Sequence, residues 1–445
     1  MVPWLQKENP STGSVFFRGN APFRPEEFEF LRSAGIDIKP VEPNENMRWC
    51  LELRHPRHGK AALVCLKEQR MPPADLIDIS AGLSASEREA AKGVGNMLNI
   101  RVSATRKHVL RDRKSMLWYM RQVLGKDGVV GVDHDSQLFW PPGRLDEELA
   151  HDADLDISAV HCLHCITDSS MDTPEDERTC TWVHSHGLAE LGAFDFDVIR
   201  PSRDIVSGAA GDVLRAIAFA IVEGELSRDT PAWEFSYPMQ LLRTVPADEF
   251  DRSAPASERD CREPEGHTDN RAVICNPVKK GLLRLKSAVR ANRFLQGEID
   301  GCVFRFSKPA TDLMADRAKK TLSVLERLMD EFAEFIGEEP WKFGVMAKIG
   351  YATDSKEGGQ EHLWFSVQGV RKDTIDATLL NKPFDIARMN PGDRGQHPIE
   401  QLTDWTIQTP IGHVTPSDMI AARLIRSQRD KIRAFMREVE ECERA

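Results

Sequence analysis

The sequence predicts an α+β protein, in which a larger domain of mixed sheet and helices precedes a small β-rich, barrel-like module with a long helix before it and a terminal helix. Stretches of alternating apolar and polar residues, typical of strands, are interspersed with stretches of helical periodicity. With 445 residues the chain is too long for one ordinary core, so we expect two or three domains. A hydrophobic content of 41% and a charged content of 29% are the balance of a soluble globular protein.

Residues 1–245 are expected to form one α+β domain with a mostly antiparallel sheet and helices on one side. Two apolar runs, 48–53 and 61–66, flank the turn-like sequence HPRHG and predict a β-hairpin. The next helix is expected to begin at a cap on Ser84 or Ser86, with two glutamates in its first turn.

The remaining elements of this domain follow the same two patterns. Residues 113–125 repeat apolar side chains at helical spacing and end at Gly125, which predicts a helix. Alternation then predicts three strands, after which an Ala-rich amphipathic helix is expected within 207–226. The strands are expected at residues 157–167, 178–187 and 193–201.

The C-terminal half begins with an expected linker, because residues 246–271 are charged, rich in Pro and Ser, and nearly free of large apolar groups. Short strands and one long helix are predicted for 272–338, with Thr311 as the N-cap of the helix. The apolar stripe of that helix comprises Met314, Ala318, Leu322, Leu325 and Met329. Residues 339–445 are expected to form the β-rich module and a charged terminal helix.

The overall charge and the missing motifs argue against several classes of function. A net charge of −11 gives no basic field that would attract nucleic acid or an anionic membrane, so neither is expected as a partner. The longest apolar stretch, 213–222, contains Arg215 and is far shorter than the roughly 18 residues of a membrane span. We find no P-loop, no G-x-G-x-x-G after a strand and no G-x-S-x-G, so no cofactor is expected.

The cysteines and the N-terminus point to a reducing compartment. The nine cysteines are odd in number and are scattered without the spacing of a disulfide framework. The first residues, MVPWLQKENPSTG, lack the basic start and the apolar run of a secretory signal. A cytoplasmic location is therefore expected, and the oligomeric state stays open.

The C-terminal part carries a series of short motifs between residues 340 and 420. They are Lys348, EHLWF (361–365), LLNKP (379–383), PGD (391–393), LTDW (402–405) and GHVTP (412–416). In order and spacing, this series resembles the bacterial domain-of-unknown-function family 2314, also called the YegJ-like family. The resemblance implies a compact β-rich module in soluble bacterial proteins, and it implies no known reaction.

The front half is similar, more loosely, to the domain-of-unknown-function family 4026. The similarity rests on a Trp-x-His-x-His-Gly-Leu segment, followed by a Leu-Gly pair and an acidic apolar strand before an Ala-rich helix. The matching residues are Trp182, His184, His186, Gly187, Leu188, Leu191 and Gly192. The resemblance implies a small cytoplasmic module of the kind carried beside toxin–immunity cassettes, and hence an immunity or stress context.

The stretch TWVHSHGL, residues 181–188, is the first candidate binding site. On a strand, Trp182, His184 and His186 share one face, so the indole flanks both imidazoles. Gly187 permits a positive φ at the bend that follows, and a corner of this kind offers a pocket for a small ligand. The sequence therefore predicts a ligand-binding corner at these three aromatic side chains.

Cysteines and histidines just upstream raise a metal site as the alternative at this corner. Zinc requires four nitrogen or sulfur ligands arranged tetrahedrally. In a regular strand, His161 and Cys165 lie on one face. Cys162 and His164 lie on the other face, so these four side chains cannot meet one ion. The spacing matches no standard zinc motif, and we therefore assign no metal.

A second candidate face lies in the C-terminal module, in EHLWF and LTDW. Alternation places His362 and Trp364 together, where an imidazole and an aromatic ring could grip a peptide or a base. Glu361 and Asp404 complete this set of candidate ligand-binding residues. The alternative, which the small size of the module favours, is that Trp364 and Trp405 form its core while the polar side chains pin turns by hydrogen bonds.

These features predict a non-catalytic binding protein that recognises a protein or a small ligand, and no catalytic residue can be named. The competing class is a metal-dependent hydrolase in which His184 and His186 are metal ligands. Elemental analysis separates the two, because the hydrolase requires about one bound transition-metal ion per chain.

Overall fold

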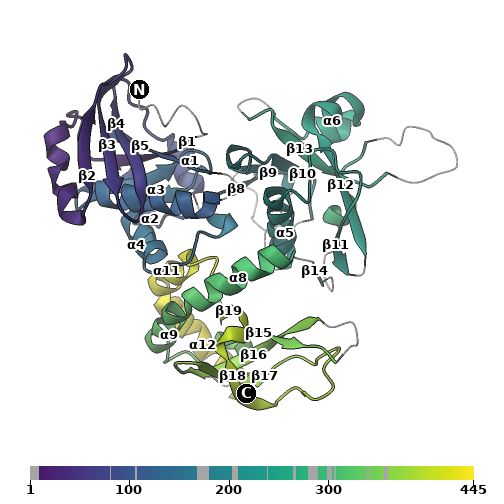
Figure 1. The fold of residues 1–445 in the computed structure, drawn as a ribbon. Helices are drawn as coiled ribbons and strands as arrows, with labels where there is room; N and C mark the ends of the chain where they lie inside the picture. The colour runs from purple at the N-terminus through teal and green to yellow at the C-terminus, as the bar shows by residue number, and fades with distance from the viewer. Residues whose placement is uncertain are drawn as a thin grey trace. The chain divides into compact units, whose positions relative to one another are not determined.

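The computed structural model describes residues 10–444 apart from a set of short segments. Those segments are 81, 106–107, 168–179, 203–208, 238, 264–266, 279–288, 298–302, 305–306, 338–339 and 355–358. The chain divides into two compact units (Figure 1). The N-terminal unit consists of Met1–Pro142 and Ile157–Ser307, and the C-terminal unit of Gly143–Asp156 and Lys308–Ala445.

The first sheet of the N-terminal unit is antiparallel, with the spatial order β2-β3-β4-β5-β1-β6-β7. The predicted hairpin is confirmed, because β3 pairs with β4 across the turn-like HPRHG sequence. The strands are β1 (Pro10–Phe17), β2 (Asp37–Val41), β3 (Met47–His55), β4 (Gly59–Leu66), β5 (Asn96–Ser103), β6 (Gly128–Asp133) and β7 (Phe139–Trp140).

One face of this sheet is covered by α3 (Val109–Leu124), whose Met120 side chain lies over β1 and β6. Gly13 and Gly131 lie beneath that side chain, and a Cβ atom at Gly131 would be 2.4 Å from the Met120 methyl carbon. These glycines therefore let the helix approach the sheet closely. The helix predicted over 113–125 is confirmed.

The opposite face carries α1 (Ala74–Ile79) and α2 (Ala85–Lys92), which share a buried apolar cluster with side chains of β1, β5 and β6. Helix α2 is capped as predicted, since the Ser84 hydroxyl accepts a hydrogen bond of 3.3 Å from the Glu87 amide. A 3-10 helix spans Pro25–Ala34. The prediction of helices on one side is wrong here, because β5 is buried on both faces and needs cover on each.

Strands between residues 162 and 304 form a separate second sheet, ordered β14-β11-β12-β13-β10-β9-β8. All its pairs are antiparallel except β10 with β13. The single sheet predicted for 1–245 is therefore wrong, because alternation identifies a strand but not its neighbour. The predicted Ala-rich helix is α5 (Ala209–Glu223). The strands are β8 (Cys162–Thr167), β9 (Cys180–His186), β10 (Asp195–Ile199), β11 (Trp233–Tyr237), β12 (Gln240–Pro246), β13 (Arg271–Cys275) and β14 (Val303–Phe304).

The segment 246–271, whose composition suggests a linker, contains two helices among its described residues. They are α6 (Ala247–Ser253) and α7 (Ala256–Arg259). Phe250 of α6 is fully buried and belongs to the apolar cluster that also contains Trp182. The buried Phe250 side chain, together with the buried ion pair of Arg262 with Asp197, thus docks a segment that otherwise has the composition of a linker.

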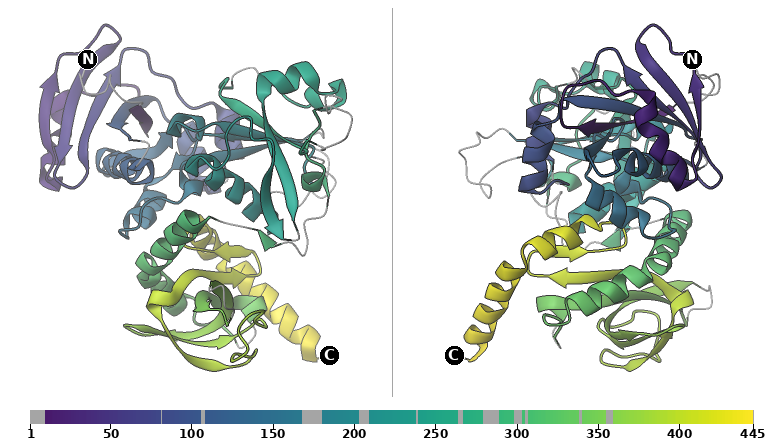
Figure 2. Two further views of the ribbon diagram at one scale, coloured as in Figure 1. Left: turned by 45° about the vertical axis from the view of Figure 1, so that its right-hand side comes forward. Right: turned by 90° about the vertical axis from the view of Figure 1, so that its left-hand side faces the viewer.

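The C-terminal unit contains an antiparallel sheet ordered β18-β17-β16-β15-β19-β20 (Figure 2). Within the described residues, the edge strands β18 and β20 do not pair with each other, so the sheet is open and the predicted barrel-like shape is wrong. The strands are β15 (Gly344–Ala352), β16 (Gln360–Val370), β17 (Thr374–Leu379), β18 (Arg394–Pro398), β19 (Leu402–Thr409) and β20 (Gly412–Val414).

Two helices, α8 (Lys308–Lys320) and α9 (Leu322–Glu331), replace the single long helix predicted before this sheet. The break falls at Thr321, whose hydroxyl lies 2.8 Å from the Arg317 carbonyl oxygen and accepts a 3.0 Å hydrogen bond from the Trp405 indole. A threonine that bonds back to the preceding turn bends a helix. The other helices of the unit are α4 (Pro142–Leu149), which begins at the last residue of the N-terminal unit, α10 (Pro340–Phe343), α11 (Ile420–Ser427) and α12 (Arg429–Arg444).

Candidate metal centre

The candidate centre lies where β8, β9 and β10 run side by side (Figure 1). In the β8–β9 register, His164 is opposite His184 and Cys162 is opposite His186. On the other side of β9, Asp197 of β10 is opposite His184. Directly opposed residues of antiparallel strands point to the same face, so the register gathers these side chains on one face of the sheet.

Three imidazoles converge at this place. The ring centroids of His164 and His184 are 5.3 Å apart, those of His164 and His186 are 4.9 Å apart, and those of His184 and His186 are 5.0 Å apart. One ring nitrogen from each lies within 4.8 Å of the other two. Zinc–nitrogen bonds of about 2.0–2.1 Å place tetrahedral ligand atoms about 3.4 Å apart. Side-chain rotations that move the ring nitrogens by about 1 Å would therefore bring all three within bonding distance of one ion.

Two more aromatic rings border the three histidines. The Trp182 indole lies 3.9 Å from the His184 ring, which confirms the prediction that it flanks this imidazole. The His267 ring lies 4.7 Å from His184 and is stacked on His186 at 5.0 Å. Sequence reasoning missed His267, because it lies in the segment with the composition of a linker, and missed His164 as a partner, because only the strand register brings it there.

The environment keeps these imidazoles uncharged. His184 is 2% exposed; burial, together with the neighbouring histidines and Arg271, lowers its pKa from the ordinary 6.5 to about 2. Burial, then His164 and Arg271, lowers the pKa of His186 to about 3, and burial also lowers the pKa of His164. A neutral imidazole is the form that ligates a metal.

The nitrogen Nδ1 of His184 is buried and has no hydrogen-bond partner within the described part of the chain. A buried polar atom without a partner costs about 1–3 kcal/mol, and such atoms are uncommon in native proteins. The other two imidazoles each have a polar neighbour at one ring nitrogen. His186 Nδ1 lies 3.5 Å from Gln137 Nε2, and His164 Nε2 lies 3.4 Å from Cys162 Sγ. Within the described part of the chain, His184 therefore contributes a buried nitrogen that a bound ion could satisfy.

A buried network of ion pairs lies next to the histidines, on β10 and β13. Asp197 is fully buried and accepts a 3.1 Å hydrogen bond from the Trp182 indole nitrogen. The same carboxylate pairs with Arg271 at 2.6 Å and with Arg262 at 3.0 Å. Since these three donors occupy it, the Asp197 carboxylate, which lies next to His184 on the neighbouring strand, is committed to positioning the strands and the indole.

The bend after β9 is built as the sequence predicts. Gly187 has a φ of 110°, and a Cβ atom at this position would lie 2.5 Å from the Val160 carbonyl oxygen. Only glycine satisfies both requirements without strain. The bend ends the strand immediately after His186 and so places that ring at the edge of the cluster.

Of the upstream cysteine and histidine pattern, the predicted shared face of Cys162 and His164 is confirmed. Cys162 and His164 contact each other beside the cluster, whereas His161 points away and its Nδ1 lies 2.6 Å from the Ile157 carbonyl oxygen. Burial raises the pKa of Cys162 to about 12, with further contributions from two nearby carboxylates. The Cys162 thiol is therefore protonated near neutral pH.

The second predicted site has internal partners for both acidic residues. The Glu361 carboxylate accepts hydrogen bonds from the backbone amides of Phe384, at 2.7 Å, and Asp385, at 3.0 Å. Asp404 accepts a 2.8 Å hydrogen bond from the Trp405 amide, and the Trp405 side chain is fully buried. These contacts hold a loop and a strand end in place.

His362 and Trp364 share one face of β16, because the residue between them, Leu363, is fully buried on the other. His362 Nδ1 lies 3.2 Å from the Thr403 hydroxyl, and Lys348 lies 5.4 Å from the centre of the Trp364 ring. The four side chains predicted in this module therefore contact their own unit, and ligand binding there stays a prediction.

The comparisons with known proteins bear on the C-terminal unit. Residues 311–416 match the model of a family described as "Uncharacterized protein conserved in bacteria (DUF2314)", which confirms the resemblance predicted for this part. The resemblance of the front half to family 4026 and the hydrolase alternative find no support in these comparisons.

No curated protein and no solved structure matches the chain. None of the helices in the described ranges combines the length and apolar character needed to traverse a bilayer. What the comparisons establish is that the segment 311–416, inside the C-terminal unit, is similar to the uncharacterised bacterial family DUF2314.

Proposed function

We propose that this protein binds a first-row transition-metal ion, with zinc as the first candidate, through His164, His184 and His186. The observation that carries the proposal is the convergence of three uncharged imidazoles, one buried and two half-buried, together with a buried nitrogen, Nδ1 of His184, that lacks a partner among the described residues. A metal ion would satisfy that atom and would use the lone pairs that burial keeps free of protons.

The chemistry of the surroundings favours a metal ion over a proton or an acidic ligand. A proton shared among the rings would require a nearby counter-charge, and Asp197 is already paired with two arginines. Arg271 also lowers the pKa of both His184 and His186, which opposes protonation of the cluster. Imidazole ligands suit zinc, copper, nickel and iron, and zinc adopts a tetrahedral site most readily.

Three protein ligands leave one tetrahedral position to be filled. Cys162 and His267 are the neighbouring candidates, and an exchangeable small ligand is the third. The last arrangement agrees with the binding corner that the sequence predicts at Trp182, His184 and His186. Binding of a thiolate to the metal would displace the proton that burial keeps on Cys162.

Metal analysis of the full chain tests the proposal. The purified protein should bind about one equivalent of zinc, and replacing any one of the three ligands, first by His184→Ala, should weaken zinc binding at least about 100-fold. His413→Ala, at an exposed position of the C-terminal unit, is the matched control and should leave zinc binding unchanged. The absorption spectrum of the cobalt-loaded protein reports whether a thiolate is bound.

Zinc binding that is unchanged in the His184→Ala variant would contradict the proposal, as would a wild-type chain that binds no first-row metal at unit stoichiometry. Because an alanine at a buried position can disturb folding, circular dichroism of each variant accompanies the titration. His164→Ala provides a second variant at the less buried edge of the cluster.

A further inference from the structure

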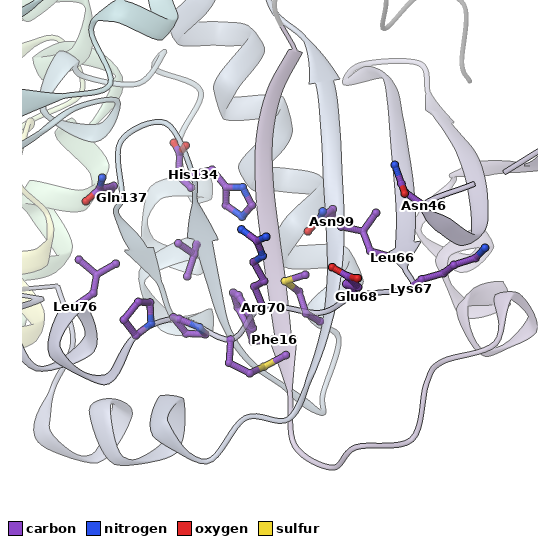
Figure 3. Close-up of a pocket in the computed structure, with 16 residues that line it drawn as sticks. Phe16, Asn46, Leu66, Lys67, Glu68, Arg70, Leu76, Asn99, His134 and Gln137 are labelled. Atoms are coloured by element: carbon purple, nitrogen blue, oxygen red, sulfur yellow. The ribbon is translucent and has the colours of Figure 1, made fainter. Parts of the chain in front are cut away.

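A cavity of about 670 Å³ lies in the N-terminal unit, on the face of the first sheet that carries α1 (Figure 3). Its apolar wall is formed by Phe16, Leu66, Leu76, Met97 and Val132, which come from strands β1, β4, β5 and β6 and from α1. A concave site of this size and lining suits a small organic molecule.

A polar chain is built into the cavity beside this wall. Ser14 is fully buried; its hydroxyl donates a 2.7 Å hydrogen bond to Asn99 Oδ1 and lies 2.7 Å from His134 Nε2. Because the only hydroxyl hydrogen goes to Asn99, the hydrogen shared with His134 belongs to Nε2. The chain fixes the His134 ring, which lines the cavity together with Asn99.

Arg70 brings a positive charge to the same part of the cavity. Its guanidinium extends toward the His134 ring (Figure 3). Asp133 also lines the cavity, but its carboxylate pairs with the buried Arg113 and so does not neutralise Arg70. Glu68, the other acidic residue of the lining, makes no ion pair with Arg70 among the described residues. The guanidinium is therefore available for a carboxylate, which it can bind with two parallel hydrogen bonds.

We propose that this cavity binds a small amphipathic carboxylate, with its apolar body against the Phe16 and Val132 wall and its carboxylate on Arg70. The cavity adjoins the histidine centre through Gln137, which lines it and whose amide lies 3.5 Å from His186 Nδ1. Carboxylate binding here uses no atom of the three-histidine centre, so the metal-free protein binds the ligand as well.

Calorimetric titration of the full, metal-free chain tests this site. Dodecanoate, kept below its micelle concentration, should bind at one site and at least about tenfold more tightly than dodecanol or dodecylammonium, because only the carboxylate pairs with a guanidinium. Arg70→Gln should weaken dodecanoate binding at least about tenfold and leave dodecanol binding unchanged. Arg111→Gln, at an exposed position of α3 on the opposite face of the sheet, is the control and should change neither.

Equal affinity for dodecanoate and dodecanol would overturn the proposal, and so would an Arg70→Gln variant that binds dodecanoate as tightly as the wild type. Dodecanoate binding that requires added zinc would place the carboxylate on the metal, and would also overturn it. Since Arg70 is exposed, its replacement is expected to leave the fold intact. The His184→Ala variant should lose zinc binding and keep dodecanoate binding, so the cavity proposal and the metal proposal can fail independently.

Discussion

The buried imidazole of His184 predicts that the metal-free protein loses stability in acid. Burial is the largest cause that lowers its pKa from 6.5 to about 2. In the unfolded chain the same group has its ordinary pKa of about 6.5. Below pH 6.5 the unfolded chain therefore binds a proton at His184, whereas the folded chain stays unprotonated there until the pH approaches 2. Because the unfolded state binds more protons, the free energy of unfolding falls as the pH falls.

The size of this effect follows from the pKa of His184. A pH of 4.5 is about two units below the pKa of the imidazole in the unfolded chain, and each unit corresponds to about 1.4 kcal/mol. Relative to pH 7, the His184 imidazole alone should therefore reduce the free energy of unfolding by about 2.5 kcal/mol. Because the residue is 2% exposed, screening by solvent removes little of this amount.

Hydrogen exchange in the peptide that covers β9 measures the local free energy of opening at pH 7.0 and 4.5, after correction for intrinsic exchange rates. The metal-free His184→Leu variant should lose about 2.5 kcal/mol less between the two pH values than the wild type, because leucine cannot titrate. Comparing each protein with itself at two pH values cancels the packing change. His108→Leu, at an exposed site, is the control. Equal losses in wild type and His184→Leu would refute the reasoning.

Two substitutions test the structure around the histidines. Gly187→Ala should lower the free energy of unfolding by about 2 kcal/mol or more in a denaturant titration, because the position needs a positive φ and a Cβ atom would meet the Val160 carbonyl oxygen. Gly211→Ala is the control, since a Cβ atom there faces open space in α5, and it should be neutral or slightly stabilising. Asp197→Asn should cost about 3–5 kcal/mol in the same assay, because it leaves the Arg262 and Arg271 charges buried without compensation, and a cost below about 1 kcal/mol would contradict the network.

Local patterns in the sequence are sufficient to predict several elements and faces. The serine cap at Ser84, the bend at Gly187 and the shared face of Cys162 and His164 depend only on neighbouring residues, and each is found as predicted. Trp182 beside His184 follows from strand periodicity in the same way. Such features are predictable because backbone geometry and side-chain alternation act over a few residues.

The errors concern relations between segments that are distant in the chain. The second sheet and the open edge of the third depend on which strands pair, and alternation carries no information about partners. At the break, the Thr321 hydroxyl also accepts a hydrogen bond from the Trp405 indole, which arrives from a strand far along the chain. Strand pairing of this kind is set by the packing of whole elements.

The sequence by itself determined the α+β class, the resemblance of the C-terminal part to an uncharacterised bacterial family, and the common face of Trp182, His184 and His186. Only the tertiary structure brought His164 and His267 to that face, through a strand register and the docking of a segment that looks like a linker. The physical reason is that a metal centre needs nitrogens within a few ångström in space, and a chain can supply them from positions with no regular spacing.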